Sequence, residues 1–99
     1  MRTQKILDVL NIIETSQEPI SSTNIALKYF SMHAEHIRGQ DIREAVNYLR
    51  KTSTSPVCSN SHGYYITNDK NKIQEQINKL QGRIDAMNDA LLGLQKFIH

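Results

Sequence analysis

The sequence predicts a mainly α-helical protein with one small β-hairpin and a long C-terminal helix. Apolar residues recur at helical spacing in three segments before residue 53, and a turn-rich stretch separates two β-prone segments between residues 57 and 67. From residue 73 onward, apolar residues recur every three or four positions. The 99 residues suffice for one small domain with an appendage. We expect the domain at residues 1–68 and a dimerisation helix at residues 69–99.

Two helices are expected in the first third of the chain. Six apolar residues between positions 3 and 15 cover most of the circumference of a helix, so this helix is expected to be buried on more than one side. Pro19 cannot continue it, because proline has no amide hydrogen to donate and clashes with the preceding turn. Ser21 is a good N-cap for a second helix over residues 22–30.

A third helix is expected from Gln40 to Thr52. Its apolar residues form one stripe of a helix with about 3.6 residues per turn, and they are Ile42, Ala45, Val46 and Leu49. The opposite face is polar and partly basic, with the side chains of Gln40, Arg43, Glu44, Asn47, Arg50 and Lys51. This face is either solvated, as in any amphipathic helix, or in contact with a ligand.

The stretch "VCSNSHGYYIT" predicts a two-stranded β-hairpin. Residues 57–59 and 64–67 are rich in β-forming side chains, and "NSHG" between them has the composition of a turn. Gly63 is expected to take the positive φ of that turn. A lone hairpin is marginally stable in water, so this one must pack on the helices.

The last segment predicts a long helix capped by Asn68 or Asp69. Its apolar residues follow a heptad pattern and form what is called the heptad seam here: Ile73, Leu80, Met87 and Leu94 at position d, with Ile77, Ile84, Leu91 and Ile98 at position a. The composition favours two parallel strands, although the flanking positions carry no charge pattern that selects an orientation. As an alternative, this helix folds back on the helix at residues 3–15 as an intramolecular clamp.

Three helices, a hairpin and a long helix in this order predict a winged helix-turn-helix followed by a long C-terminal coiled-coil helix. In that architecture the third helix enters the major groove of DNA and the hairpin, or wing, lies alongside it. Gln and Asn pair with adenine, Arg pairs with guanine, and Glu accepts from cytosine, while hydroxyl and basic groups hold phosphates. The predicted DNA contacts are Ser22, Thr23, Arg38, Gln40, Arg43, Glu44, Asn47, Lys51, Asn60 and His62.

Four stretches carry a family resemblance: "EPISSTNIALKY", "IRGQDIREAVNYLRK", "PVCSNSHGYYIT" and the heptad tail. In this order they resemble small winged helix-turn-helix DNA-binding proteins of phage and prophage genomes in Gram-positive bacteria. The resemblance covers residues 18–98 and is most specific in "IREAVNYLR" followed by "GYYIT". It implies DNA binding at a phage replication or regulatory locus. Those proteins usually carry a glycine in the loop "RKTSTSPV", and this sequence has none there.

Composition argues against several other classes. The net charge of +2 permits nucleic acid as a partner without requiring it. We expect a cytoplasmic protein of the bacterial host cell, because no apolar run suits a transmembrane helix, no signal peptide is recognisable and one cysteine allows no internal disulfide. We expect no enzyme and no cofactor, since the sequence has no Gly-rich phosphate loop and no triad pattern. The metal-like spacing of His33, His36, Cys58 and His62 is better explained without a metal.

The expected function is sequence-specific binding of double-stranded DNA by a homodimer joined through the heptad seam. It would serve phage or prophage transcriptional regulation or mark a replication origin. A two-fold dimer predicts a palindromic site with half-sites one helical turn apart or a multiple of it. The alternative is a protein–protein adaptor that recruits or blocks a host or phage factor, which the weak net charge and the acidic residues Asp41 and Glu44 keep open. No membrane partner is expected.

Overall fold

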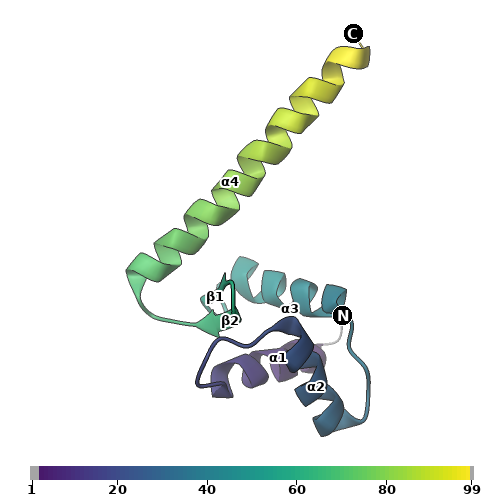
Figure 1. Cartoon of the computed structure of the whole chain (residues 1–99), viewed down its shortest axis with the longest axis vertical. Helices are drawn as coiled ribbons and strands as arrows, with labels where there is room; N and C mark the ends of the chain where they lie inside the picture. Colours follow the sequence, from purple (N-terminus) through teal and green to yellow (C-terminus); the bar gives the residue numbers. More distant parts are fainter. Residues whose placement is uncertain (1–2, 99) are drawn as a thin grey trace. The chain divides into compact units, whose positions relative to one another are not determined.

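The computed structural model describes residues 3–98 and confirms the predicted fold class (Figure 1). The elements are α1 (Thr3–Thr15), α2 (Ser22–His33), α3 (Gly39–Lys51), β1 (Val57–Asn60), β2 (Gly63–Ile66), α4 (Lys70–Gln95) and a final 3-10 turn, η1 (Lys96–Ile98). The chain separates into two compact units, the first ending at Asn68 and the second beginning at Asp69. The first unit has the helix, helix, helix and hairpin order of a winged helix-turn-helix, and the long helix α4 forms most of the second.

The core of the first unit lies where α1 packs against both α2 and α3. The predicted apolar stripe of α3 is confirmed, because its four residues are all buried. α1 buries four apolar residues of its own, Ile6, Val9, Ile12 and Ile13. α2 contributes Ile25 and Tyr29. The core therefore fixes which face of α3 points outward, whereas Leu7 on α1 and Leu27, Phe30 and Met32 on α2 stay exposed.

The hairpin is held to the helical core by an isolated β-bridge that the sequence analysis did not predict. Ile20, between α1 and α2, forms an isolated antiparallel bridge with Tyr64. The amide of Ile20 donates to the carbonyl of Tyr64 at 2.9 Å, and the amide of Tyr64 donates back to the carbonyl of Ile20 at 2.9 Å. A single bridging residue leaves no periodic pattern in the sequence. It nevertheless anchors the wing to the segment that enters α2.

Gly63 makes this anchoring possible. Its φ is +137°, in the region that favours glycine, and a Cβ there would lie 2.3 Å from the carbonyl carbon and oxygen of Ile20. The hairpin pairs Asn60 with Gly63, so its loop is the two residues Ser61 and His62. β1 therefore ends one residue later than the sequence suggests, at Asn60. β2 begins and ends one residue earlier than the sequence suggests, at Gly63 and Ile66.

Two helix ends depend on residues in the left-handed region that are not glycine. α2 continues to His33, three residues beyond the predicted end, and stops where Ala34 adopts φ +52° and donates its amide to the carbonyl of Phe30. After α3, Ser53 adopts φ +55° in the loop that lacks a glycine. The predicted N-cap of α2 is confirmed, because the Ser21 hydroxyl accepts from the amide of Asn24 at 3.2 Å.

α4 has 26 residues and is about 40 Å long at 1.5 Å per residue. Asp69 caps it, accepting from the amide of Asn71 at 2.9 Å. Six seam side chains expose at least half of their surface: Ile77, Ile84, Met87, Leu91, Leu94 and Ile98. Among residues 3–98, no helix combines the length and apolarity needed to cross a membrane.

Candidate nucleic-acid interface

Five of the predicted DNA contacts share one exposed face of α3, on the side opposite its buried stripe. This polar face of α3 consists of Gln40, Arg43, Glu44, Asn47 and Lys51. The four buried residues of α3 hold the helix against the core, so the five polar side chains project together into solvent. The helix thereby presents amide, guanidinium, carboxylate and ammonium groups over about three turns. These are the groups that pair with base edges and phosphates.

Two contacts within this face organise its side chains. Gln40 donates from Nε2 to Oε1 of Glu44 at 3.2 Å, one helical turn further on. The Lys51 ammonium lies 5.9 Å from the centre of the Tyr48 ring. Arg43 lies beside the start of the helix, with Nη1 3.5 Å from the point where a Cβ of Gly39 would stand. Glu44 is therefore partly engaged by Gln40, whereas Arg43 is directed along the N-terminal turn.

Arg38 is paired with an acidic neighbour at the start of α3. Its Nε and Nη2 donate to the Asp41 carboxylate at 3.2 and 3.1 Å, and its backbone amide donates to the same carboxylate at 3.1 Å. These hydrogen bonds raise the pKa of Arg38 and lower the pKa of Asp41. The guanidinium is still largely exposed. A phosphate bound by Arg38 would therefore share it with Asp41.

The polar-face assignment was wrong for one residue, Arg50. Its Nε donates to the carbonyl of Val57 at 2.8 Å, and the side chain is partly buried. Arg50 therefore ties the end of α3 to β1. Sequence periodicity cannot reveal this contact, because the acceptor is a backbone carbonyl seven residues away on another element. The bond helps to fix where the wing stands beside α3.

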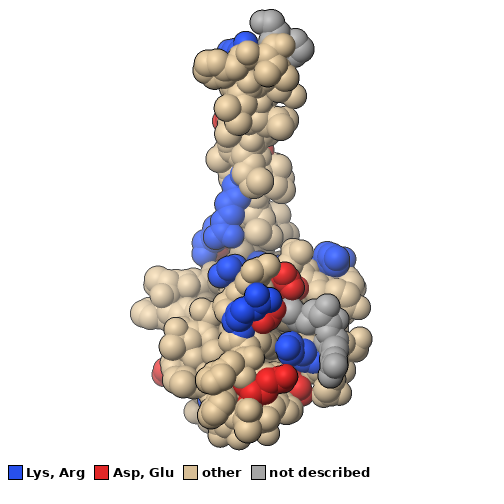
Figure 2. Space-filling view, turned by 90° about the vertical axis from the view of Figure 1, so that its right-hand side faces the viewer, with Lys and Arg blue, Asp and Glu red and all other residues tan. Residues whose placement is uncertain are grey.

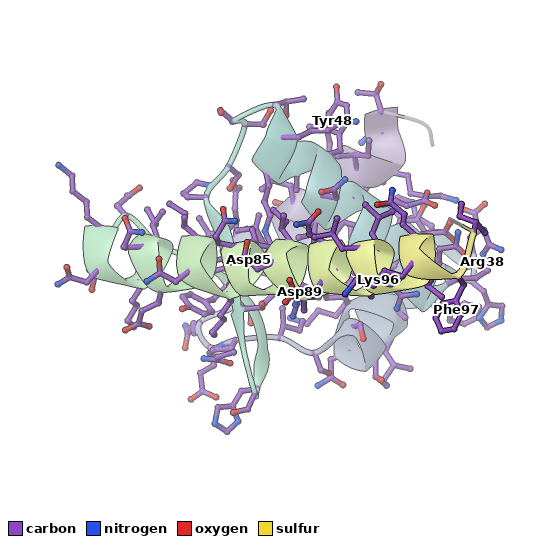
Figure 3. The ribbon with its side chains drawn as sticks, turned by 90° about the horizontal axis from the view of Figure 1, so that it is seen from above. Arg38, Tyr48, Asp85, Asp89, Lys96 and Phe97 are labelled. Atoms are coloured by element: carbon purple, nitrogen blue, oxygen red, sulfur yellow. The ribbon has the colours of Figure 1, made fainter. Side chains whose placement is uncertain are left out.

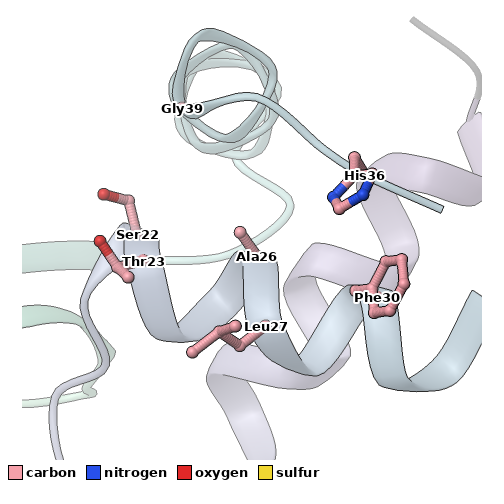
Figure 4. A pocket seen from close by; sticks show the side chains of 7 residues that line it. All are labelled: Ser22, Thr23, Ala26, Leu27, Phe30, His36 and Gly39. Carbon is pink, nitrogen blue, oxygen red and sulfur yellow. The ribbon is translucent and has the colours of Figure 1, made fainter. Parts of the chain in front are cut away.

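The predicted contacts on α2 lie close to the start of α3. Ser22 and Thr23, both exposed in the first turn of α2, line a groove of about 520 Å³ together with Gly39. Figure 4 shows their hydroxyls near Gly39. The rest of the groove is mainly apolar and is formed by Ala26, Leu27, Phe30 and His36. The N-terminal ends of α2 and α3 thus meet at one edge of the first unit.

At the tip of the wing, Asn60 and His62 are both exposed. The Asn60 Oδ1 accepts from the amide of His62 at 2.8 Å, which closes the two-residue turn. This bond fixes the side chain of Asn60. The imidazole of His62 remains exposed at the end of the hairpin, where a wing meets the DNA backbone.

Sequence reasoning missed Tyr48 as a part of this surface. Tyr48 is exposed and lines a second groove of about 390 Å³ between α1 and α3, together with Thr3, Ile6, Glu44, Asn47 and Lys51. The signal was present, because position 48 lies on the flank of the helix rather than on its apolar stripe. Tyr48 therefore adds an aromatic ring beside Asn47.

Charge on the first unit is mixed rather than uniformly basic. Figure 2 shows Lys and Arg side chains interspersed with Asp and Glu on one face. On α3, Asp41 and Glu44 stand among Arg43, Arg50 and Lys51. Such a surface favours contacts of defined geometry over general attraction to phosphates.

The histidines of the α2–α3 region take part in protein contacts. Nε2 of His33 lies 3.1 Å from the Asp8 carboxylate, and the ring of His36 stacks on Phe30 with centroids 4.6 Å apart. Within residues 3–98, no group of three or more His, Cys, Asp or Glu side chains is placed to hold a metal ion. These histidines thus have structural partners of their own.

Comparisons with protein-family models, curated proteins and solved structures found no match to this chain. A functional assignment therefore depends on the chemistry of α3, the hairpin and α4.

Proposed function

We propose that the protein binds double-stranded DNA in a sequence-specific manner as a homodimer. The observation that carries this proposal is the polar face of α3, which is exposed opposite a fully buried stripe and stands beside an anchored hairpin. An α-helix with such a face fits the major groove of B-DNA, and the hairpin fits the adjacent backbone. The proposed biological role is phage or prophage transcriptional regulation or origin binding in the bacterial cytoplasm.

Each side chain has a role in this proposal. Arg43 donates two hydrogen bonds to guanine, Asn47 and Gln40 pair with adenine, and Glu44 accepts from cytosine. The remaining contacts fix the register on phosphates without reading sequence, and they are Ser22, Thr23, Arg38, Lys51, Asn60 and His62.

The heptad seam supports the homodimer. Its exposed aliphatic side chains on α4 would lose contact with water if a second copy of α4 packed against them. The alternative intramolecular clamp has a small receiving surface on α1, because four of its six apolar residues are buried in the core of the first unit and only Leu7 is exposed. Two copies related by a two-fold axis would read a palindromic site.

The first test is fluorescence anisotropy of a labelled random-sequence duplex, titrated with the full chain from roughly 50 to 200 mM salt. A dimer that neutralises six or more phosphates should lose on the order of a thousandfold in affinity across this range. Selection of bound sequences from a random pool should then yield a palindrome. Absence of binding at the lowest salt would refute the proposal.

Substitutions on α3 test the reading role directly. Arg43→Ala and Asn47→Ala should each reduce affinity for the selected site by roughly tenfold or more, because a bidentate base contact contributes about 1–3 kcal/mol. Affinity for random DNA should change less, since phosphate contacts dominate it. Lys96→Ala, which removes one charge from the second unit, is the matched control for Arg43→Ala. Equal effects of Arg43→Ala on both duplexes would contradict base reading.

One observation favours the adaptor as a second candidate. The groove beside α2 is mainly apolar, and Leu27 at its edge exposes 62% of its surface. An exposed apolar groove suits a protein ligand better than a phosphate. Failure of DNA binding together with intact folding would favour this candidate.

A further inference from the structure

We propose that two α4 helices pair in antiparallel orientation, which places the DNA-binding units at opposite ends of a rod about 40 Å long. This inference rests on the homodimer proposed above and adds its geometry. Three properties of α4 carry it: the symmetry of the heptad seam, the separation of charge along the helix, and the position of Lys70.

The heptad seam matches itself completely in antiparallel order. An antiparallel pair of helices alternates a with d across its core, and all eight seam residues find such a partner. The layers are Ile73 with the partner's Ile98, Ile77 with the partner's Leu94, Leu80 with the partner's Leu91, and Ile84 with the partner's Met87. Every layer is therefore aliphatic: one pairs Ile with Ile, one pairs Leu with Leu, and two pair Ile with Leu or Met.

Charge is unevenly distributed along α4. From residue 69 to 83 there are four basic and two acidic residues, whereas from residue 84 to 98 there are one basic and two acidic residues. Figure 3 shows the acidic pair, Asp85 and Asp89, along the middle of the helix, with Lys96 near its end. A parallel pair would place the two basic halves side by side. An antiparallel pair places each basic half beside an acidic half, which is the electrostatically complementary arrangement.

Lys70 discriminates between the orientations most sharply. It begins α4 and occupies the a position three residues before Ile73. In a parallel pair, Lys70 would face the partner's Lys70 across the core, next to two helix N-termini whose dipoles are also positive there. In an antiparallel pair of the register given above, the two Lys70 side chains stand at opposite ends of the pair and do not meet across the core.

The core-flanking positions are consistent with the same orientation. All e positions of the seam are amides, namely Gln74, Gln81, Asn88 and Gln95. In an antiparallel pair e faces e, and an amide both donates and accepts hydrogen bonds, so each amide meets a partner of its own kind. On the other flank, Arg83 faces the partner's Ala90, one residue from the partner's Asp89.

The orientation determines where the DNA-binding units are attached. Residues 67–69 join β2 to α4, so each first unit is tethered at the amino end of its own helix. Parallel helices would bring the two tethers within about 10 Å, which is the usual distance between packed helices. Antiparallel helices in the register given above separate the two tethers by about 50 Å along the axis, which lies between one and two turns of DNA.

Disulfide cross-linking of the full chain tests this proposal. In a Cys58→Ala background, Ile77→Cys and Leu94→Cys are prepared separately, and each is oxidised alone and after mixing with the other. The proposal predicts no cross-link in either variant alone, because the two copies of position 77 would be about 25 Å apart. The mixture should give a cross-linked heterodimer, because these positions share one core layer and fall within disulfide reach.

Two other results would each overturn part of the proposal. A cross-linked dimer of Ile77→Cys alone would overturn the antiparallel orientation while leaving the homodimer standing. A monomer mass in light scattering, with no cross-link in any sample, would overturn the homodimer itself. Leu80→Cys mixed with Leu91→Cys supplies an independent layer, because the two copies of either position would be about 17 Å apart in the antiparallel pair. Far-ultraviolet circular dichroism confirms that each variant keeps its helix. DNA binding is measured separately by anisotropy, so its loss is not confused with either result.

Discussion

At the scale of single residues, Ala34 and Ser53 hold backbone conformations that glycine would adopt more easily. Their φ angles are +52° and +55°, and the left-handed region costs a residue with a Cβ roughly 1–2 kcal/mol. The loop after α3 contains no glycine, and Ser53 supplies its left-handed turn. Both residues thus adopt the left-handed conformation despite its steric cost.

Ser53→Gly should therefore stabilise the protein by about 0.5–1 kcal/mol, since the relief of strain exceeds the added entropy of the unfolded chain. The shift in the urea midpoint at unchanged m-value measures this effect. Ser61→Gly is the matched control, because Ser61 does not have a positive φ, and it should lower stability slightly. A destabilised Ser53→Gly variant would contradict the argument. Gly63→Ala should destabilise the protein, since the added Cβ would overlap the backbone of Ile20.

The ion pair at the start of α3 predicts an acid-dependent loss of stability. The hydrogen bonds from Arg38 lower the pKa of Asp41 below its usual value of 3.8. Because the folded state favours the carboxylate, the pair stabilises the fold above pH 3.8, and this contribution disappears as the pH falls through the lowered value. Solvent exposure keeps the effect small.

Asp41→Asn should remove that part of the acid dependence. The measurement is the urea midpoint of wild type and variant, followed from neutral pH into the acid range as the carboxylate becomes protonated. The two curves should converge as the pH falls. Glu14→Gln, an exposed carboxylate on α1, is the control and should keep the wild-type profile. Parallel curves for Asp41→Asn and wild type would argue against the pair.

At the scale of elements, the sequence predicts best where burial is periodic. The four buried positions of α3 recur at helical spacing, so the sequence identifies both the helix and its outward polar face. The end of α2 escapes prediction because Ala34 is not a typical C-cap residue. The isolated bridge at Ile20 could not be predicted, because a single bridging residue leaves no periodic pattern in the sequence. The contact of Arg50 could not be predicted, because only the tertiary fold brings its acceptor, the carbonyl of Val57, within reach.

The heptad seam of α4 gives a prediction at this scale. Ile84→Asp should place two carboxylates near the centre of the proposed core and convert the dimer to a monomer, because an unpaired charge is costly to bury. Light scattering reports the mass, and anisotropy should show weaker binding to a two-half-site duplex. Asn78→Asp adds the same charge at position b, outside the seam, and should leave the dimer intact. A dimeric Ile84→Asp variant would exclude the seam as the interface.

At the scale of the whole molecule, the homodimer proposed above requires both half-sites to lie on the same side of the duplex. Inserting five base pairs between the selected half-sites should rotate one of them to the opposite side of the duplex, since a turn spans about 10–10.5 base pairs. Affinity should then fall to that of a duplex with one half-site. Inserting about ten base pairs restores the phase and should recover part of the lost affinity. Equal affinity at all spacings would show that the two units bind independently.

The bridge between Ile20 and Tyr64 also has a mechanical consequence. Any tension carried by α4 enters the first unit through β2, because the strand ends at Ile66 and α4 begins at Lys70. β2 is bonded on one side to β1 and on the other to Ile20, so a pull is divided between two neighbours. A force applied through α4 therefore acts first on the hairpin and its bridge to Ile20, and only afterwards on the buried residues of α3.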